Sequence, residues 1–420
     1  MKVSYQTYEL AHLAMLPARV MSDATRLWFK NPLNPASYTP FGRNMAAWAE
    51  LFERMTRRYG KPIFGLDHTT IDGVDVPVHE EIVWQRPFCR LLRFARSRPD
   101  LDETQGRLLL VAPMSGHYAT LLRGTVEALL PHFDVYVTDW ADTRMIPQAA
   151  GVFDLDDYID YVIAMCQFLG TQEPKRPVHT MAVCQPAVPV LAGVALMSSA
   201  GNALAPASMV LMGGPIDTRR SPTAVNRLAA DRGTEWFRQN CLRTVPLPYP
   251  GAGREVYPGF LQLSGFMAMN LDRHVNAHID MFKHLVKNDG DSAERHREFY
   301  DEYLAVMDLT AEFYMQTIET VFVQHALPKG EMSHRGRPVD LTAIRGTGLL
   351  TIEGEKDDIS GLGQTEAAQD LCSNLPDDMK EHYVQAEVGH YGVFNGSRYR
   401  RNVVPRIVDF TRRMETRAAS

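Results

Sequence analysis

Val178-His179-Thr180-Met181-Ala182-Val183-Cys184 predicts a short buried strand, and Gln185-Pro186-Ala187-Val188-Pro189-Val190-Leu191 directly after it predicts the start of an apolar helix. Cys184 therefore lies at the turn between a strand and a helix. Unpaired amide groups and the helix dipole at such a turn favour the thiolate form of a cysteine and stabilise negative charge. The stretch predicts that Cys184 is a nucleophile; the alternative is a buried cysteine that only fills space.

Two motifs further along the chain supply the partners that a nucleophile needs. The loop Gly354-Glu355-Lys356-Asp357-Asp358 follows a predicted strand, and Asp357 is favoured over Asp358 as the acid because it comes three residues after the glycine. His390 lies in the glycine-flanked loop Glu387-Val388-Gly389-His390-Tyr391-Gly392, also at a strand end, and is the predicted general base. Nucleophile, acid and histidine in this order are typical of an α/β-hydrolase triad.

The pattern around these motifs predicts a mostly parallel sheet with helices on both faces, an α/β fold. Paired antiparallel strands are expected at 79–84 and 89–95. Further strands are expected at 108–113, 133–140, 178–184, 207–213, 348–353 and 381–386, and helices between them at 117–131, 154–169 and 364–372. The sequence thus predicts an α/β-hydrolase core made of residues 71–215 and 345–415.

Two helical additions to this core are predicted, an N-terminal extension (1–70) and a lid inserted at 216–344. In the extension, apolar residues along one side of a first helix indicate packing against the core or self-association, and a second helix is expected at 46–59. The lid is expected to contain helices at 224–241 and 297–323. Its apolar run 257–269 indicates either a groove for a hydrophobic chain or a core between lid helices.

The oxyanion of an acyl-transfer intermediate needs backbone N–H donors, and two loops are placed to supply them. The N–H of Gln185 is the first donor, and the loop after strand 108–113 supplies the second through Met114 or, as second choice, Ser115. His117 is predicted either to contact the substrate or to cap the following helix. The turn that contains Asp139 and Trp140 is predicted to form a pocket wall, because its strand ends at the same edge of the sheet.

Composition excludes several other classes of protein. Hydrophobic residues make up 45% of the chain and the net charge is −6, which gives no reason to expect a nucleic-acid partner. The five cysteines are scattered, so neither a disulfide framework nor a zinc site is predicted, and free thiols fit a cytoplasmic protein. No secretory signal or transmembrane segment is expected, and neither is a metal or a bound cofactor.

Four stretches of the chain resemble the intracellular poly(3-hydroxybutyrate) depolymerases, and the similarity extends over nearly all of 1–415. The stretches are Val111-Ala112-Pro113-Met114-Ser115-Gly116-His117-Tyr118, Val137-Thr138-Asp139-Trp140, Ala182-Val183-Cys184-Gln185-Pro186 and Glu387-Val388-Gly389-His390-Tyr391-Gly392-Val393-Phe394. The resemblance implies a Cys184–Asp357–His390 triad, a polyester of 3-hydroxybutyrate as substrate, and residence at the surface of storage granules beside other granule-associated proteins.

Related functions stay open beside this resemblance. Polyhydroxyalkanoate synthases share the cysteine triad, but their nucleophile box is usually G-x-C-x-G, whereas Ala182 and Pro186 stand at the outer positions here. The sequence is also compatible with a small-ester hydrolase and with a catalytically silent granule-associated protein. Since a thioester transfers readily to a thiol, the sequence leaves open whether water or coenzyme A accepts the acyl group. Homo-oligomerisation is also left open.

Overall fold

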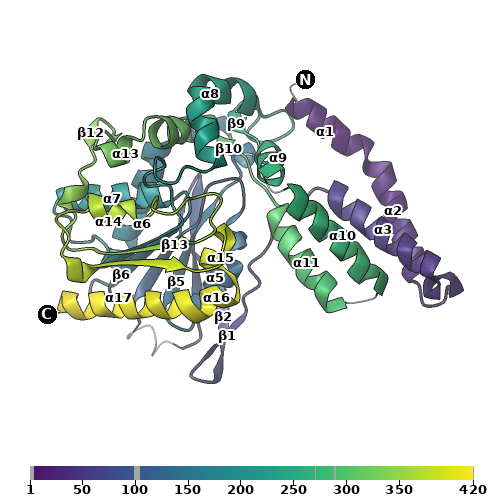
Figure 1. Cartoon of the computed structure of the whole chain (residues 1–420), viewed down its shortest axis with the longest axis horizontal. Helices are drawn as coiled ribbons and strands as arrows, with labels where there is room; N and C mark the ends of the chain where they lie inside the picture. The colour runs from purple at the N-terminus through teal and green to yellow at the C-terminus, as the bar shows by residue number, and fades with distance from the viewer. Residues whose placement is uncertain (1–3, 99–104, 270, 288–289, 420) are drawn as a thin grey trace.

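The computed structural model describes residues 4–98, 105–269, 271–287 and 290–419 (Figure 1). Its centre is a sheet with the strand order β1-β2-β3-β5-β4-β6-β7-β13-β14. The strands are β1 (His68–Ile71), β2 (Val74–Arg86), β3 (Cys89–Arg96), β4 (Arg107–Val111), β5 (Asp134–Trp140), β6 (Val178–Val183), β7 (Ser208–Met212), β13 (Gly348–Gly354) and β14 (Lys380–Gln385). The first three strands pair antiparallel, and those from β5 to β14 run parallel.

Helices cover both faces of the parallel strands, as continuous apolar strands require. The helices α5 (Arg123–Leu129) and α17 (Val404–Ala419) lie on one face, and α6 (Leu155–Gln172), α7 (Ala187–Ser199) and α14 (Ala367–Leu371) lie on the other. All residues of β4, β5, β6, β7 and β13 are buried. The predicted α/β-hydrolase fold and the expected strand positions are confirmed.

The chain between β7 and β13 is mainly helical, with a small three-stranded sheet. It contains α8 (Ala224–Cys241), β8 (Arg243–Thr244), β9 (Glu255–Tyr257), α9 (Gly259–Met269), α10 (Leu271–Lys287), α11 (Gly290–Tyr303), β10 (Leu309–Thr310), α12 (Ala311–Thr317) and α13 (Ala326–Lys329). The prediction of one helix over 297–323 is wrong, because α11 ends at Tyr303 and β10 separates it from α12. At this break Leu309 pairs with Tyr257, and the Met307 N–H donates to the Gly116 carbonyl of the core (2.7 Å).

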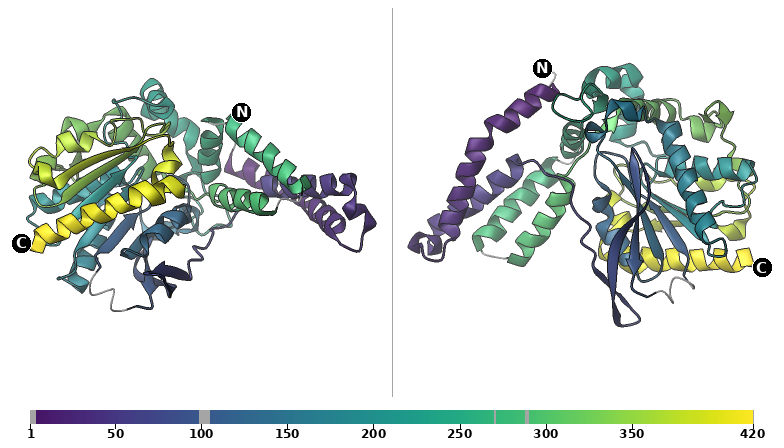
Figure 2. Two further views of the ribbon diagram at one scale, coloured as in Figure 1. Left: turned by 60° about the horizontal axis from the view of Figure 1, so that its bottom comes forward. Right: turned by 180° about the vertical axis from the view of Figure 1, so that it is seen from behind.

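The N-terminal residues form α1 (Tyr5–Ala14), α2 (Leu16–Lys30) and α3 (Pro40–Thr56). The helix α3 begins six residues earlier than the predicted second helix, because the Thr39 hydroxyl caps it and Pro40 occupies its first turn. Together α1, α2, α3, α10 and α11 form a helical arm that extends to one side of the sheet (Figures 1 and 2). The apolar side chains of Leu10, Leu13 and Val20 are exposed, so they do not pack against the core.

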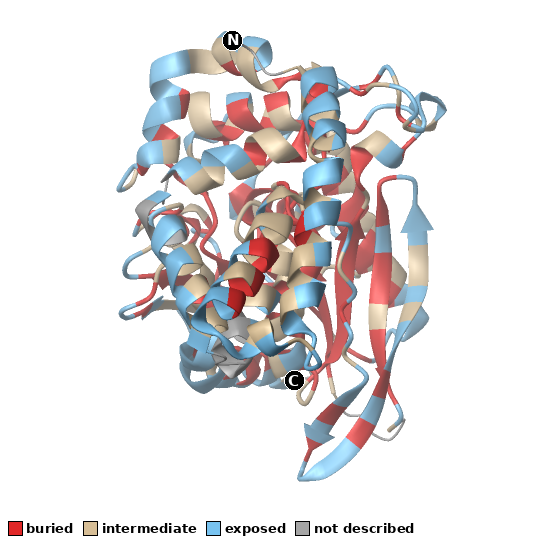
Figure 3. Cartoon of the chain, turned by 90° about the vertical axis from the view of Figure 1, so that its right-hand side faces the viewer, coloured by how far each residue is buried: buried red, intermediate tan, exposed pale blue. Residues whose placement is uncertain are grey.

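Burial follows these layers (Figure 3), with buried strands inside and exposed positions along the outer helices and the β1–β2 hairpin. Among the described helices, none combines the length and the apolar character that crossing a membrane requires. The division into extension, core and lid stays a prediction.

Candidate active site

Cys184 lies between β6 and α7 with a φ of +67°, in the left-handed region that non-glycine residues rarely adopt. Its N–H donates to the Met212 carbonyl (2.7 Å), and its carbonyl accepts from the Ala187 N–H (3.1 Å). Such strain typically costs about 1–3 kcal/mol and persists at sites where geometry matters. Gly214 is needed beside this turn, because a Cβ there would come within 2.1 Å of the Ala187 Cβ.

His390 and Asp357 form a buried hydrogen-bonded pair at the same edge of the sheet. The His390 Nδ1 lies 2.8 Å from Asp357 Oδ2, and the other carboxylate oxygen accepts from the N–H groups of Ile359 (2.9 Å) and Ser360 (2.8 Å). These bonds hold the carboxylate in one orientation. The neighbouring Asp358 is exposed, so of the two candidate acids the structure brings Asp357 to the histidine.

The Cys184 sulfur lies close enough to the His390 ring to interact electrostatically with it, so the structure brings the three predicted residues together. Burial of the ring disfavours its cation, but the Cys184 sulfur and the Asp357 carboxylate outweigh burial and raise the pKa of His390 well above its ordinary value. A histidine that holds its proton beside a thiol suits a thiolate–imidazolium pair, the reactive form of a nucleophilic cysteine.

A hydrogen bond joins the loop of one predicted oxyanion donor, Met114, to the side chain of the other, Gln185. The Met114 N–H donates to the side-chain Oε1 of Gln185 at 3.3 Å, so this donor already has a partner. Within the described chain, the backbone N–H of Gln185 makes no hydrogen bond. Ser115, the second choice, is partly buried in the same loop. Sequence reasoning missed the contact of the Gln185 side chain, since only its backbone was considered.

Asp139 and Trp140 lie at the end of β5, but no contact among the described residues joins them to Cys184. The Asp139 carboxylate is buried and forms an ion pair with Lys61. The Trp140 indole N–H donates to the Ala112 carbonyl (2.9 Å), and its ring packs against Tyr158. Through this hydrogen bond Trp140 fixes the backbone at Ala112, where the loop that carries Met114 begins. Its predicted role in a pocket wall stays a prediction.

His117 lies beneath the helical insertion. It is buried, its Nε2 lies 3.1 Å from the Tyr303 carbonyl oxygen, and burial lowers its pKa to about 4. Its ring contacts those of Tyr303 and Phe266, and Tyr303 in turn contacts Tyr391 beside the catalytic candidate His390. No local pattern in the chain predicted this aromatic cluster, although Phe266 belongs to the apolar run 257–269.

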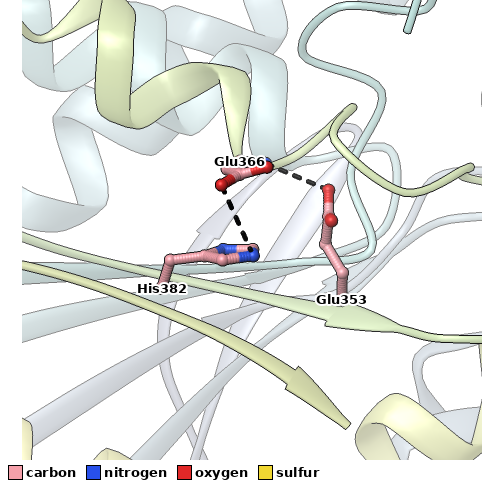
Figure 4. A group of neighbouring side chains, drawn as sticks. All are labelled: Glu353, Glu366 and His382. Atoms are coloured by element: carbon pink, nitrogen blue, oxygen red, sulfur yellow. Dashed lines mark hydrogen bonds and ion pairs between the residues drawn. The ribbon is translucent and has the colours of Figure 1, made fainter. Parts of the chain in front are cut away.

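A second group of side chains has the composition of a metal site (Figure 4). Glu353, Glu366 and His382 offer ligand atoms that all lie within 4.8 Å of one another. However, the buried Glu353 carboxylate already accepts three backbone N–H groups, from Gly363 (2.8 Å), Thr365 (2.6 Å) and Glu366 (3.0 Å). These bonds fix the loop before α14, which accounts for the buried carboxylate without a metal.

Two cavities in the structure are lined by residues other than Cys184, Asp357 and His390. A cavity of about 750 Å³ is lined by residues such as Gly106, Val178, Ala207 and Thr347, which precede or begin β4, β6, β7 and β13. Because the triad follows the carboxyl ends of the strands, this cavity lies at the opposite edge of the sheet. A smaller cavity of about 340 Å³ lies between α1, α3 and α9, with Tyr8, Arg58 and Phe260 among its lining residues.

A buried pair of carboxyl groups connects the loop after β5 with the helical insertion and α1. Asp142 accepts from the Asp308 N–H (3.1 Å) and pairs with Arg144 (2.8 Å). Asp308 accepts from the Tyr5 hydroxyl (2.8 Å) and from the Gly259 N–H (2.9 Å). Burial, followed by the charge of Asp142, raises the pKa of Asp308 to about 7. Arg144 thus faces the carboxyl groups of both Asp142 and Asp308. Asp308 therefore keeps its proton to a higher pH than an ordinary aspartate does.

Stability should therefore fall as the pH rises from about 4 to about 7, because the unfolded chain releases the Asp308 proton near its ordinary pKa of 3.8 while the folded chain keeps it. In the variant Asp308→Asn the side chain at this position cannot ionise. We expect the variant to match the wild type near pH 4 and to exceed it above pH 7 by on the order of 2–4 kcal/mol, at about 1.4 kcal/mol per pKa unit. Denaturant unfolding across this pH range measures the difference. An equal gap between the two proteins at every pH would contradict the assignment.

Known proteins show similarity to part of this chain. Residues 213–415, just under half of the chain, match the family model described as PHB de-polymerase C-terminus. Among curated proteins the sequence comparison finds no significant match. Similar solved structures include a serine hydrolase from Cycloclasticus zankles (12% identity, 80% of this chain and 99% of that chain, TM-score 0.43). They also include the 2-hydroxy-6-oxo-6-phenylhexa-2,4-dienoate hydrolase of Rhodococcus sp. strain RHA1 (12%, 80% and 99%, TM-score 0.41).

These structural similarities are too low to extend the fold assignment, which rests on the strand order and on the turn at Cys184. The family match covers the insertion, β13, β14 and the loops that carry Asp357 and His390. The strand order is that of an α/β-hydrolase, and residues 213–415 are similar to the C-terminal part of PHB depolymerases.

Proposed function

We propose that this protein cleaves the ester bonds of poly(3-hydroxybutyrate) in storage granules, with Cys184 as nucleophile, His390 as general base and acid, and Asp357 as the group that orients the histidine. The observation that carries the proposal is the hydrogen-bonded pair of Asp357 and His390 beside Cys184, with Cys184 in the strained turn after β6. The match to the PHB depolymerase C-terminus model supports the choice of substrate.

The chemistry begins when His390 takes the thiol proton and the Cys184 sulfur attacks an ester carbonyl of the polymer. The N–H groups of Gln185 and Met114 stabilise the oxyanion of the tetrahedral intermediate. His390 then gives its proton to the departing hydroxyl oxygen, so the alcohol end of the polymer leaves and the acyl group stays on sulfur as a thioester. Water or the thiol of coenzyme A attacks this thioester, transfers its proton to His390, and releases the acid or the acyl thioester.

The Gln185 side chain has a part in this sequence. Its Oε1 holds the Met114 N–H in the absence of substrate, and an arriving oxyanion must take over that donor. At 3.3 Å this hydrogen bond is long, so its exchange costs little. The amide of Gln185 thereby satisfies a donor that would otherwise be left without a partner until the substrate arrives.

The test uses native granules of poly(3-hydroxybutyrate) with the purified protein, with and without coenzyme A. We expect release of 3-hydroxybutyrate or its oligomers, or of their coenzyme A thioester, and the product names the acceptor. Soluble short-chain esters serve as a matched substrate control, because a small-ester hydrolase would cleave these and leave the granules intact. Incorporation of 3-hydroxybutyryl-CoA into polymer, without release from granules, would assign a synthase instead. If none of these substrates is turned over, the protein is a catalytically silent granule-associated protein.

A further inference from the structure

The helices α1 and α2 present a row of apolar side chains to solvent. Six of these side chains are between 61% and 72% exposed: Leu10, Leu13, Val20, Met21, Leu27 and Trp28. Isolated exposed apolar residues are ordinary on a protein surface, but a continuous row of them marks a surface that binds something.

The opposite side of α2 packs against α3 mainly through polar contacts, with one aromatic pair near the tip, Phe29 and Phe41. Ser22 is the buried residue of α2, and the Arg19 guanidinium donates to the Thr56 carbonyl at 2.6 Å. Lys30 forms an ion pair with Glu50 at 2.6 Å. An amphipathic helix of a globular protein normally turns its apolar stripe toward its own core. This helix turns its polar side inward instead, so its apolar side is left for a partner outside the described chain.

The spacing of the exposed row indicates what kind of partner fits. Intervals of three and four residues alternate along Leu10, Leu13, Pro17, Val20, Ala24 and Leu27. This is the spacing of the a and d positions through which one helix packs against another. Met21 and Trp28 each follow a d position and widen the stripe to the three positions in seven that helices of a bundle bury. The partner that fits is a helix.

Charges beside the row do not oppose a second copy of the chain. Three of them are neutralised within their own chain: Glu9 pairs with Arg58 (2.7 Å), Asp23 with Arg26 (2.9 Å) and Lys30 with Glu50 (2.6 Å). Arg19 is turned away from the row and donates to the Thr56 carbonyl of α3 (2.6 Å). The neighbouring helix α3 adds exposed apolar residues at seven-residue intervals, Phe41, Trp48 and Met55. Two adjacent helices with such rows are the half of a four-helix bundle that one subunit would supply.

We propose that the protein is a homodimer in which α1 and α2 of two copies pack antiparallel across a two-fold axis. In this register Leu10 faces Leu27 of the second copy, Leu13 faces Ala24, and Pro17 faces Val20, so every residue of the row has an apolar partner and the surface is complementary to itself. The arm favours antiparallel packing, because α1 begins beside the core and α2 ends at the far tip (Figure 1). Antiparallel helices place the two cores at opposite ends, whereas parallel helices would bring both cores to the same end.

The first experiment measures the mass of the full chain in solution by light scattering over a concentration series. We expect wild type at twice the chain mass of 47.3 kDa. The double variant Val20→Glu, Leu27→Glu should be monomeric, with its dissociation constant raised at least about 100-fold, because carboxylates cannot be buried unpaired in the seam. The matched control is Val74→Glu, which places the same charge on an exposed valine of the β1–β2 hairpin, and it should stay dimeric. Circular dichroism verifies that the variants are folded.

The second experiment tests the direction of the two helices. Under oxidising conditions, Leu13→Cys together with Ala24→Cys should form a disulfide between chains, and Leu13→Cys alone should not. A disulfide between chains of the Leu13→Cys variant alone would show parallel helices, and no disulfide in the double variant would overturn the proposed register.

A monomeric wild type at every concentration, or a dimeric glutamate variant, would overturn the dimer. If wild type is monomeric and the glutamate variant no longer sediments with granules, the row contacts the polymer and the dimer is excluded. None of these measurements depends on catalytic activity, so the dimer and the proposed function can fail independently.

Discussion

Replacing Cys184 by alanine is expected to lower the rate of ester cleavage by at least about 10⁴-fold, because the variant lacks the atom that forms the acyl-enzyme. The hydrogen bond between His390 and Asp357 and the backbone donors around the site would remain, but they have no nucleophile to assist. The rate at which soluble products are released from native granules measures the loss. Mass spectrometry of wild type stopped during turnover should find the acyl group on the peptide that contains Cys184.

The matched control for this variant is Cys241→Ala. Cys241 is the other free cysteine that is partly exposed, and it lies at the end of α8, so its removal should leave the rate within about twofold of wild type. An acyl adduct on any other residue, or an alanine variant at position 184 that retains its rate, would exclude the cysteine mechanism. Cys184→Ser should retain only a small part of the activity, since a hydroxyl ionises far less readily than a thiol.

Asp357→Asn should have the second-largest effect, a loss of about 10²–10⁴-fold in kcat/KM. The carboxylate accepts the Nδ1–H of His390 and leaves the other ring nitrogen to the thiol. An amide can present its N–H₂ group to Nδ1 instead, which favours the wrong tautomer. Removal of the negative charge also lowers the pKa of His390 from its raised value, since the carboxylate is one of the groups that raise it. The pH profile of kcat/KM should therefore change together with its magnitude.

Asp358→Asn is the control that the chain itself provides. Asp358 is the next residue and is exposed, so the same change of side chain there should leave kcat/KM within about twofold of wild type. If the two variants lost equal activity, the loss would come from a general disturbance of the loop. If only Asp358→Asn were inactive, the assignment of the acid would be wrong.

The sheet and the order of its motifs could be predicted because they depend on local patterns. Continuous apolar runs mark strands covered on both faces, and the turn at Cys184 follows from one strand that leads into one helix. The glycines around Asp357 and His390 marked the loops after β13 and β14. The contact between these two residues required only that neighbouring parallel strands end at the same edge.

The features that could not be predicted depend on contacts between distant segments. The break between α11 and α12 exists because Met307 and Leu309 bond to Gly116 and Tyr257, whereas the local pattern continues to favour a helix. Periodicity identified an apolar side on the first helix, but it could not tell that this side faces solvent. The Gln185 side chain reaches Met114 across the turn, which only side-chain geometry reveals.

The origin of the three proposed catalytic side chains has an evolutionary consequence. Cys184 follows β6, Asp357 follows β13 and His390 follows β14, while the chain between β7 and β13 supplies none of them. That chain leaves the sheet and returns to it on two adjacent strands. Recombination at these two neighbouring points could therefore exchange the whole insertion for another one. The insertion and the three proposed catalytic side chains could then diverge separately within one lineage.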